Sequence, residues 1–345
     1  MKWIDYNIDE RNYMLQEIAT QKQISLNAVE KDWWVTAVLK ALFQTPFAPY
    51  LLFKGGTSLS KGWHIINRFS EDIDISFGRD WFLDKGYTYA ACENKSQRER
   101  LRKKSREIIT TEFAKALDEQ MKVLGISGYT IQAVTEQRTR DGVEPIDSDK
   151  DPTVLQVFYE SIVTPSEDYV KPMVKVEISC LSLSEPFAQR PISSMIHERF
   201  TEADEDCLCV INTVSPERTF LEKAFLLNEE FQKAKPRTRR MSRHYYDLEK
   251  MMDTEFGKKA LVDSTLYNRI IDHRHKYNTL HYVDYERNRS QSIAFYPPTE
   301  LLPAFEKDYA EMKNSMVFKE ALAFDDLMKR IAELQERFHT MQQNS

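Results

Sequence analysis

The sequence predicts an α+β protein, with a mixed or antiparallel sheet in its first part and a mostly helical C-terminal part. Apolar and polar residues alternate over 71–77 and 173–181, which is the pattern of half-buried strands. After residue 181 the spacing becomes helical, apart from a short apolar run at 207–211. We therefore expect two domains, an α/β domain of residues 1–200 and a mostly helical domain of residues 201–345.

The expected elements follow from the local spacing of apolar residues and from turn formers. A polar segment, 138–152, is rich in turn formers and is expected to be an exposed loop. Helices are expected at 9–43, 57–66 and 94–123, and from starts near Pro216, Ser242 and Leu302. Strands are expected at 50–53, 71–77, 128–137, 153–162, 173–181 and 207–211.

Composition narrows the class of protein. The chain has 345 residues, 41% hydrophobic and 30% charged, which is typical of globular proteins. No apolar run reaches the roughly 18–20 residues of a membrane helix, and the N-terminus becomes polar too early for a signal peptide. Four scattered cysteines indicate a reducing cytoplasm, and a net charge of −6 argues against a surface that is basic throughout.

The stretch 53–77 combines a glycine pair with two aspartates around one isoleucine. It does not match the P-loop pattern, because Lys61 stands where that pattern needs glycine. Residues two apart on a strand share a face, so Asp72 and Asp74 are expected to lie together. Their mutual repulsion is removed by a divalent cation, and carboxylate oxygens suit Mg²⁺ or Mn²⁺.

A third carboxylate on a neighbouring strand would complete such a site. Glu177 is the one acid inside the alternating segment 173–179, which makes it the candidate. Gly55 and Gly56 would let the backbone approach a triphosphate, and Thr57 and Ser58 would open a helix whose N-terminus favours anions. The alternatives are that the two aspartates are merely solvated and that Glu177 pairs with a surface lysine.

Five segments, in this order, resemble the AbiEii/AbiGii toxin family within the polymerase β-like nucleotidyltransferases, which includes the MenT toxins. They span roughly residues 30–250 and read EKDWWV (30–35), FKGGTSLSK (53–61), RFSEDIDI (68–75), SPERTFLEKAFLL (215–227) and RHYYDL (243–248). The resemblance implies a toxin of a toxin–antitoxin or phage-defence system, with a cognate antitoxin as partner. It further implies a cytoplasmic enzyme that transfers a nucleotide from an NTP to RNA, most notably to the acceptor end of tRNA, and so inhibits translation.

The resemblance also implies roles for particular residues. It assigns Gly56, Thr57 and Ser58 to the triphosphate, and Asp72 and Asp74 to Mg²⁺. Lys223 is expected to neutralise triphosphate charge, and Asp247 to orient that lysine or a substrate hydroxyl. From the residues alone, a surface lysine beside an apolar helix face is the favoured interpretation of Lys223, and Asp247 is equally a structural hydrogen-bond acceptor.

Two departures from the family pattern concern the substrate. The family commonly has an arginine–aspartate pair before the tyrosine, whereas this chain reads Arg243-His244-Tyr245. The segment between the aspartates and Lys223 is also long.

Two basic clusters, at 95–106 and 233–243, are candidates for RNA contact. A solvated helix face is favoured for the first cluster. For the second, phosphates binding the charges and bases stacking on the tyrosines suit a single-stranded RNA end. The arginines assigned to RNA are Arg237, Arg239, Arg240 and Arg243.

The predicted mechanism is Mg²⁺-dependent in-line nucleotidyl transfer, with Glu177 or an aspartate taking the proton of the attacking hydroxyl. Lys223 and the turn at 56–58 would hold the departing pyrophosphate. Two alternatives stay open: transfer to a protein or a small molecule, and a non-catalytic module that binds RNA or an antitoxin.

Overall fold

The structure is a computed structural model, and it describes residues 2–139, 142–164, 171–278, 280–317 and 321–341. The chain divides into two compact units. Unit 1 comprises Met1–Gly62 and Phe69–Thr213, and unit 2 comprises Trp63–Arg68 and Val214–Ser345. The short segment Trp63–Arg68 therefore belongs to the second unit, although in the sequence it lies between the two parts of the first unit.

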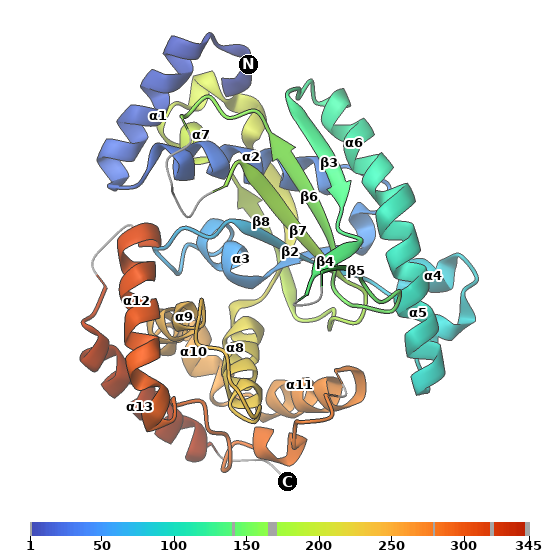
Figure 1. Cartoon of the computed structure of the whole chain (residues 1–345), viewed down its shortest axis with the longest axis vertical. Coiled ribbons are helices and arrows are strands. Elements are labelled where there is room, and N and C mark those ends of the chain that lie inside the picture. The colour runs from blue at the N-terminus through green and yellow to red at the C-terminus, as the bar shows by residue number, and fades with distance from the viewer. Residues whose placement is uncertain (1, 140–141, 165–170, 279, 318–320, 342–345) are drawn as a thin grey trace. The chain divides into compact units, whose positions relative to one another are not determined.

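Unit 1 is built on a mixed sheet, seven-stranded among the described residues, which confirms the predicted fold class. Strand β2 pairs parallel with β7 and antiparallel with β1, and β1 pairs parallel with β9. The order across the sheet is β3 (Tyr129–Ala133), β6 (Thr153–Tyr159), β7 (Met173–Ser179), β2 (Asp72–Phe77), β1 (Leu51–Lys54), β9 (Cys209–Val214) and β8 (Phe187–Ile192) (Figure 1).

Helices cover one face of this sheet. Helix α2 (Leu26–Leu42) contacts β7 and β2, and α6 (Ala114–Val123) contacts β3. The Trp34 ring stacks on Tyr159 with 4.8 Å between ring centroids, and Tyr129 Oη donates to Asp118. The strand residues on this face are fully buried: Leu155, Val157, Val174, Val176 and Ile178. The opposite face of β7 and β2 carries the polar residues of the alternating pattern.

The remaining helices of unit 1 lie along the first 200 residues. The predicted helix 9–43 is two helices, because Gln23 adopts a left-handed conformation with φ 55° and Ser25 caps the second. The predicted helix 94–123 is continuous except for a π-helical turn at Ile109–Phe113. The helices are α1 (Ile8–Lys22), α3 (Gly55–Lys61), α4 (Asp80–Asp84), α5 (Lys95–Ile108) and α7 (Met195–Arg199).

Two parts of unit 1 differ from the expected elements. The expected strand 128–137 is divided into β3 and β4 (Glu136–Arg138), and β4 pairs with β5 (Val143–Pro145), which lies in the segment expected as a loop. Residues 140–141 of that segment lie outside the described residues. Strand β8 has no counterpart in the sequence prediction, because it is a largely exposed edge strand containing Pro191.

Unit 2 is mostly helical. It consists of α8 (Pro216–Glu230), α9 (Ser242–Met252), α10 (Glu255–Ala260), α11 (Ser264–Tyr277), α12 (Leu302–Met316) and α13 (Phe324–His339). Aromatic side chains form much of its core, for instance Phe338 against Phe220 and Phe295. Among all described residues, no helix has both the length and the apolar character needed to cross a membrane.

Candidate active site

The acidic residues of unit 1 meet because β2 and β7 run parallel in register. Asp74 lies opposite Glu177 and Asp72 opposite Lys175, so the four side chains share one face of the sheet. Ile73 and Ile75 occupy the other face and are fully buried, which fixes the orientation of the aspartates. The structure thus brings together Asp72, Asp74 and Glu177, here called the carboxylate cluster.

Lys175 supplies a positive charge within the carboxylate cluster. Its Nζ contacts Glu177 Oε1, and both side chains are about one-third exposed. Burial lowers the pKa of Lys175, but the bond to Glu177 and attraction to Glu177, Asp72 and Asp74 outweigh it, so the pKa is raised. The alternative in which Glu177 pairs with a lysine therefore describes this structure, and the lysine is on the same strand.

Gly55 allows the carboxylate of Asp74 to lie close to the turn between β1 and α3. Lys54 is in register with Asp74, and Gly55 follows with φ +78°. A Cβ added at Gly55 would lie 2.0 Å from Asp74 Oδ2. Real atoms cannot approach so closely, so the position requires glycine for both backbone and space.

The hydroxyl groups after the glycine pair are used inside the protein. Thr57 and Ser58 are fully buried. Thr57 Oγ1 contacts Ser70 Oγ at 2.8 Å and the Asp72 carbonyl oxygen at 2.5 Å, and Ser58 Oγ donates to the Gly55 carbonyl at 2.8 Å. These two side chains therefore fix the turn and the start of β2, while Gly56 is only partly buried.

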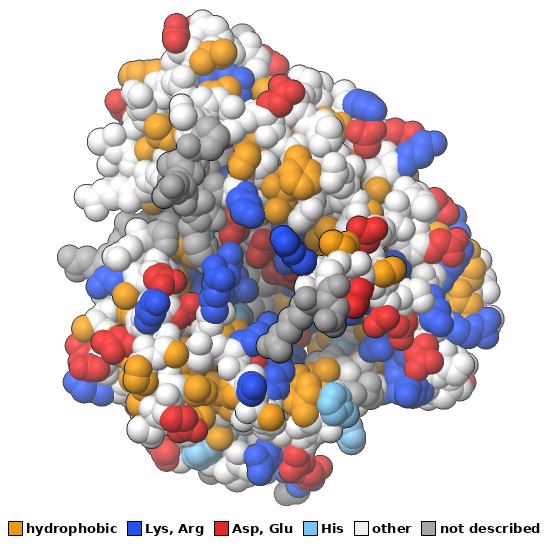
Figure 2. All heavy atoms as spheres, viewed as in Figure 1, with side chains coloured by type: hydrophobic (Ala, Val, Ile, Leu, Met, Phe, Trp, Pro, Cys, Tyr) orange, Lys and Arg blue, Asp and Glu red, His pale blue; other side chains and the backbone are white. Residues whose placement is uncertain are grey.

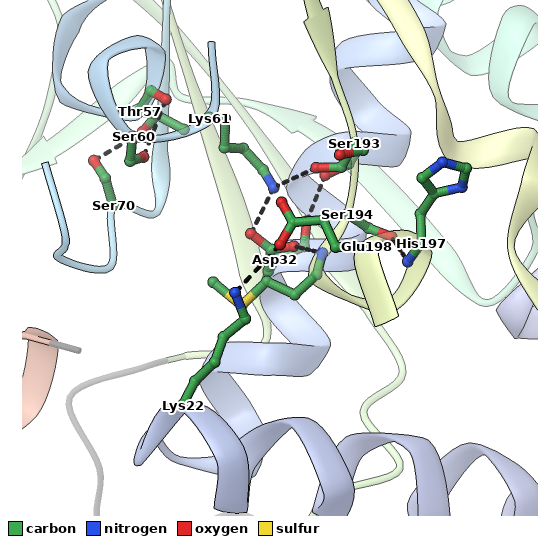
Figure 3. A network of polar contacts seen from close by, with 12 residues as sticks. Lys22, Asp32, Thr57, Ser60, Lys61, Ser70, Ser193, Ser194, His197 and Glu198 are labelled. Atoms are coloured by element: carbon green, nitrogen blue, oxygen red, sulfur yellow. Dashed lines mark hydrogen bonds and ion pairs between the residues drawn. The ribbon is translucent and has the colours of Figure 1, made fainter. Parts of the chain in front are cut away.

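Three consecutive charged residues of α2 anchor the segments that carry the site. Lys31 Nζ donates to Glu71 Oε2 at 2.7 Å, directly before Asp72. Asp32 accepts from Lys61 Nζ at 2.6 Å, at the last residue of α3, and Lys61 also donates to the Ser193 carbonyl oxygen (Figure 3). The triplet is part of the segment EKDWWV (30–35), but no structural role for it was inferred from the sequence. Three charged residues inside an otherwise apolar helix were the signal that could have indicated one.

The first member of the triplet, Glu30, anchors another loop. It accepts hydrogen bonds from the Ser161 hydroxyl and from the Ile162 N–H at 2.9 Å. Burial raises the pKa of Glu30, against the effect of these bonds. Each acid or base of the triplet thus has a partner from a different segment of unit 1.

Replacing Lys31 by methionine is expected to lower the free energy of unfolding by about 3 kcal/mol or more, because Glu71 would stay buried without its cation. The double variant Lys31→Met/Glu71→Leu should recover most of that loss, since an apolar pair can replace a buried ion pair. Urea unfolding measures both. Lys40→Met, at a half-buried lysine of the same helix, is the control. A double variant as unstable as the sum of its single variants would contradict the pairing.

Unit 2 contains a second charged cluster, the Arg68–Asp247–Lys223 triad. Arg68 binds Asp247 through two hydrogen bonds, Nε to Oδ1 at 2.7 Å and Nη2 to Oδ2 at 2.8 Å. Lys223 Nζ lies 2.8 Å from Asp247 Oδ2. Asp247 is fully buried, and the side chains of the two cations are at most 8% exposed.

The electrostatics of the triad follow from two cations sharing one carboxylate. Burial raises the pKa of Asp247, but Arg68 and Lys223 outweigh it and hold that pKa well below its usual range. Burial lowers the pKa of Lys223, and repulsion by Arg68 and Arg243 adds to the effect against the attraction of Asp247. Lys223 is therefore buried rather than a surface lysine. Asp247 is a structural acceptor for both cations, independently of any role in a reaction.

The predicted RNA-binding arginines lie in or just before α9. Arg237 is bound to Glu230 by its Nη2 at 2.8 Å, with 64% of its side chain exposed, and Arg239 is also exposed. Arg240 has φ +61° and donates its backbone N–H to Asp308, whereas Arg243 is half-buried near Lys223. On the face shown in Figure 2, acidic and basic side chains are interspersed, as expected for a modest net charge.

A divalent cation fits part of the carboxylate cluster. Asp72 and Asp74 offer hard oxygen donors on one strand face, and Gly55 has no Cβ that would collide with the Asp74 carboxylate. Within the described ranges, no group of three acidic, histidine or cysteine residues is arranged to hold a metal ion. Glu177 is bound to Lys175, so it could join the aspartates only by exchanging that lysine.

Comparison with models of protein families identifies the family of the chain. A family model described as "Nucleotidyl transferase AbiEii toxin, Type IV TA system" matches residues 37–330. That range includes both the carboxylate cluster and the Arg68–Asp247–Lys223 triad. A search of curated proteins finds no match.

Proposed function

The chain belongs to the AbiEii nucleotidyl transferase toxin family of type IV toxin–antitoxin systems, and we propose that it transfers a nucleotide from an NTP to the 3′ end of an RNA, most suitably a tRNA. The observation that carries this proposal is the register of β2 and β7, with Gly55 packed against Asp74. Carboxylates on one strand face can hold the divalent cation that such a transfer uses, and a glycine turn beside them lets the backbone approach a triphosphate. The reaction would take place in the cytoplasm and inhibit translation, and a cognate antitoxin would restrain it.

Asp72 and Asp74 would hold Mg²⁺ or Mn²⁺, and Glu177 would join them after leaving Lys175. The ion would supply charge neutralisation at the reacting phosphate and a lowered pKa of the attacking hydroxyl. A carboxylate of the cluster takes the hydroxyl proton as the new O–P bond forms at the α-phosphorus. The bond to pyrophosphate then breaks, and pyrophosphate leaves with its electron pair.

The phosphates of the NTP would be bound by backbone and by cations rather than by hydroxyl groups. The turn at Gly55 and Gly56 exposes backbone, whereas the hydroxyls of Thr57 and Ser58 are engaged in fixing its shape. Lys223 would neutralise charge on the triphosphate, and Asp247 would position Lys223. The exposed arginines Arg237 and Arg239, together with Arg240 and Arg243, would bind RNA phosphates.

The test is a transfer assay with purified protein, Mg²⁺, each α-³²P-labelled NTP and total tRNA. Wild type is expected to label RNA with one NTP. Asp74→Asn is expected to reduce the rate by at least about a thousandfold, because it removes one charge from the site where the cation would bind. Asp80→Asn, an exposed acid six residues later, is the matched control and should retain full activity.

The other outcomes decide between the alternatives. Label on protein or on a small molecule, abolished by Asp74→Asn, would keep the chemistry and change the acceptor. No label with any NTP, in protein that binds RNA, would contradict a transferase and favour a binding module. Equal rates for Asp74→Asn and wild type would remove the carboxylate cluster from the reaction.

A further inference from the structure

The face of the sheet that carries the carboxylate cluster also carries a polar row leading away from it. The strand registers place Asp72 beside Lys175, Lys175 beside Gln156, and Gln156 beside Gln132. Residues in register on neighbouring strands share a face, so these four side chains form a line across β2, β7, β6 and β3. Helices α2 and α6 pack on the opposite face.

Phe158 stands next to this polar row. It lies two residues after Gln156 on β6, so both side chains point to the same face. Its neighbours in register are Met173 and Thr130. The other apolar residues of β6 near it, Val157 and Tyr159, point to the core and are buried, whereas Phe158 is 36% exposed. A partly exposed aromatic ring is thus presented on the strand face that carries Gln156, with Met173 and Thr130 beside it.

The spacing suits a nucleotide strand that starts at the carboxylates. Strand β6 is two strands from β2, or about 10 Å, and Phe158 is offset from the Asp72 row by two residues, or about 7 Å. The two positions are therefore roughly 12 Å apart, which the terminal nucleotides of a single strand can cover. Lys175 and the two glutamine amides lie along the same route.

We propose that Lys175, Gln156, Gln132 and Phe158 bind the terminal nucleotides of a single-stranded RNA acceptor. One base stacks on Phe158, and the glutamine amides, which both donate and accept, contact base edges. Lys175 attracts the phosphate that follows. This inference rests on the proposed function and adds to it the surface that orients the acceptor.

In-line transfer favours the acceptor over the NTP as the occupant. The attacking hydroxyl must approach the phosphorus from the side opposite the departing pyrophosphate. The glycine turn for the phosphates follows β1, which borders β2 on one side, while β7 and β6 lie on the other. An acceptor that runs over β7 and β6 therefore enters from the side that the in-line geometry requires.

The first experiment measures binding without NTP or metal, so that it does not depend on catalysis. A short single-stranded RNA with 2-aminopurine at its 3′ end is titrated with protein, because stacking on an aromatic ring quenches the fluorophore. Wild type should quench it. Phe158→Ala should lose most of the quenching and raise Kd about tenfold, the usual order for removing one stacked base.

Two variants serve as matched controls. Phe187→Ala removes a phenylalanine that is 45% exposed on β8, at the other end of the same sheet, and should bind like wild type. Phe158→Tyr keeps an aromatic ring and should restore quenching, which also separates stacking from a folding defect. Gln156→Ala should weaken binding by a smaller factor and leave the stacked signal in place.

The second experiment uses the transfer assay. Phe158→Ala should raise KM for RNA about tenfold and leave KM for the NTP unchanged. Quenching that depends on Phe158 in a protein that transfers nothing would support the RNA surface and reject the proposed function. Active protein with unchanged RNA binding in Phe158→Ala would overturn the surface and keep the function. Quenching of a 2-aminopurine NTP instead of the RNA would overturn the acceptor assignment.

Discussion

Gly55→Ala is expected to reduce nucleotidyl transfer by at least about a hundredfold, because a displacement near 1 Å at a reacting group has an effect of that order. The new Cβ would lie 2.0 Å from Asp74 Oδ2 and 2.8 Å from Asp74 Cγ. Either the aspartate or the turn must therefore move. The φ of +78° adds backbone strain of about 1 kcal/mol for any residue with a side chain.

A second glycine of the same unit separates these two effects. Gly86 has φ +84°, and a Cβ built there would meet no atom within 4 Å. Gly86→Ala should therefore lose stability through the same backbone strain but keep full transfer activity. The measurements are single-turnover transfer rates and urea unfolding for both variants. Equal inactivation by the two substitutions would show that backbone strain, rather than the contact with Asp74, is responsible.

The carboxylate cluster was largely predictable from the sequence because it depends on local periodicity. The alternation of 71–77 places Asp72 and Asp74 on one strand face, independently of the strand order and pairing of the sheet. Glu177 was chosen as the one acid of a later strand, and the structure does place it beside Asp74. The parallel pairing itself could not be read from the sequence, because about a hundred residues separate the two strands.

The features that sequence reasoning missed depend on side-chain geometry or on contacts between distant segments. The alternation of 173–179 places Lys175 on the same strand face as Glu177, but the contact between the two depends on side-chain geometry. Arg68 opens one of the recognisable segments, yet nothing local indicates that it would pair with a residue on α9. The polar row from Asp72 to Gln132 exists only through the registers of four strands. Periodicity gives the face of each residue, and register gives its neighbours.

Asp247→Ala is expected to lower the stability of unit 2 by about 3–5 kcal/mol, the usual effect of removing one partner from a buried ion pair. Arg68 and Lys223 would remain buried without the carboxylate that both now bind. Hydrogen exchange followed by mass spectrometry should show faster exchange in α8 and α9. Asp253→Ala is the matched control, because that aspartate also binds two arginines but is 54% exposed, and such exposed pairs contribute little.

Acid titration tests the same triad by its charge. A carboxylate whose folded pKa is depressed contributes stability above its unfolded pKa, about 3.9 for aspartate, and that stability is lost as the pH falls toward the folded pKa. Wild type should therefore lose stability below about pH 4, and Asp247→Asn should show a flatter acid limb from a lower starting value. Identical acid limbs in the two proteins would mean that Asp247 does not carry its charge in the folded state. Lys223 binds the same carboxylate as Arg68. Identical acid limbs would therefore contradict the role that the proposed function gives to Asp247, which is to position Lys223 through its charge.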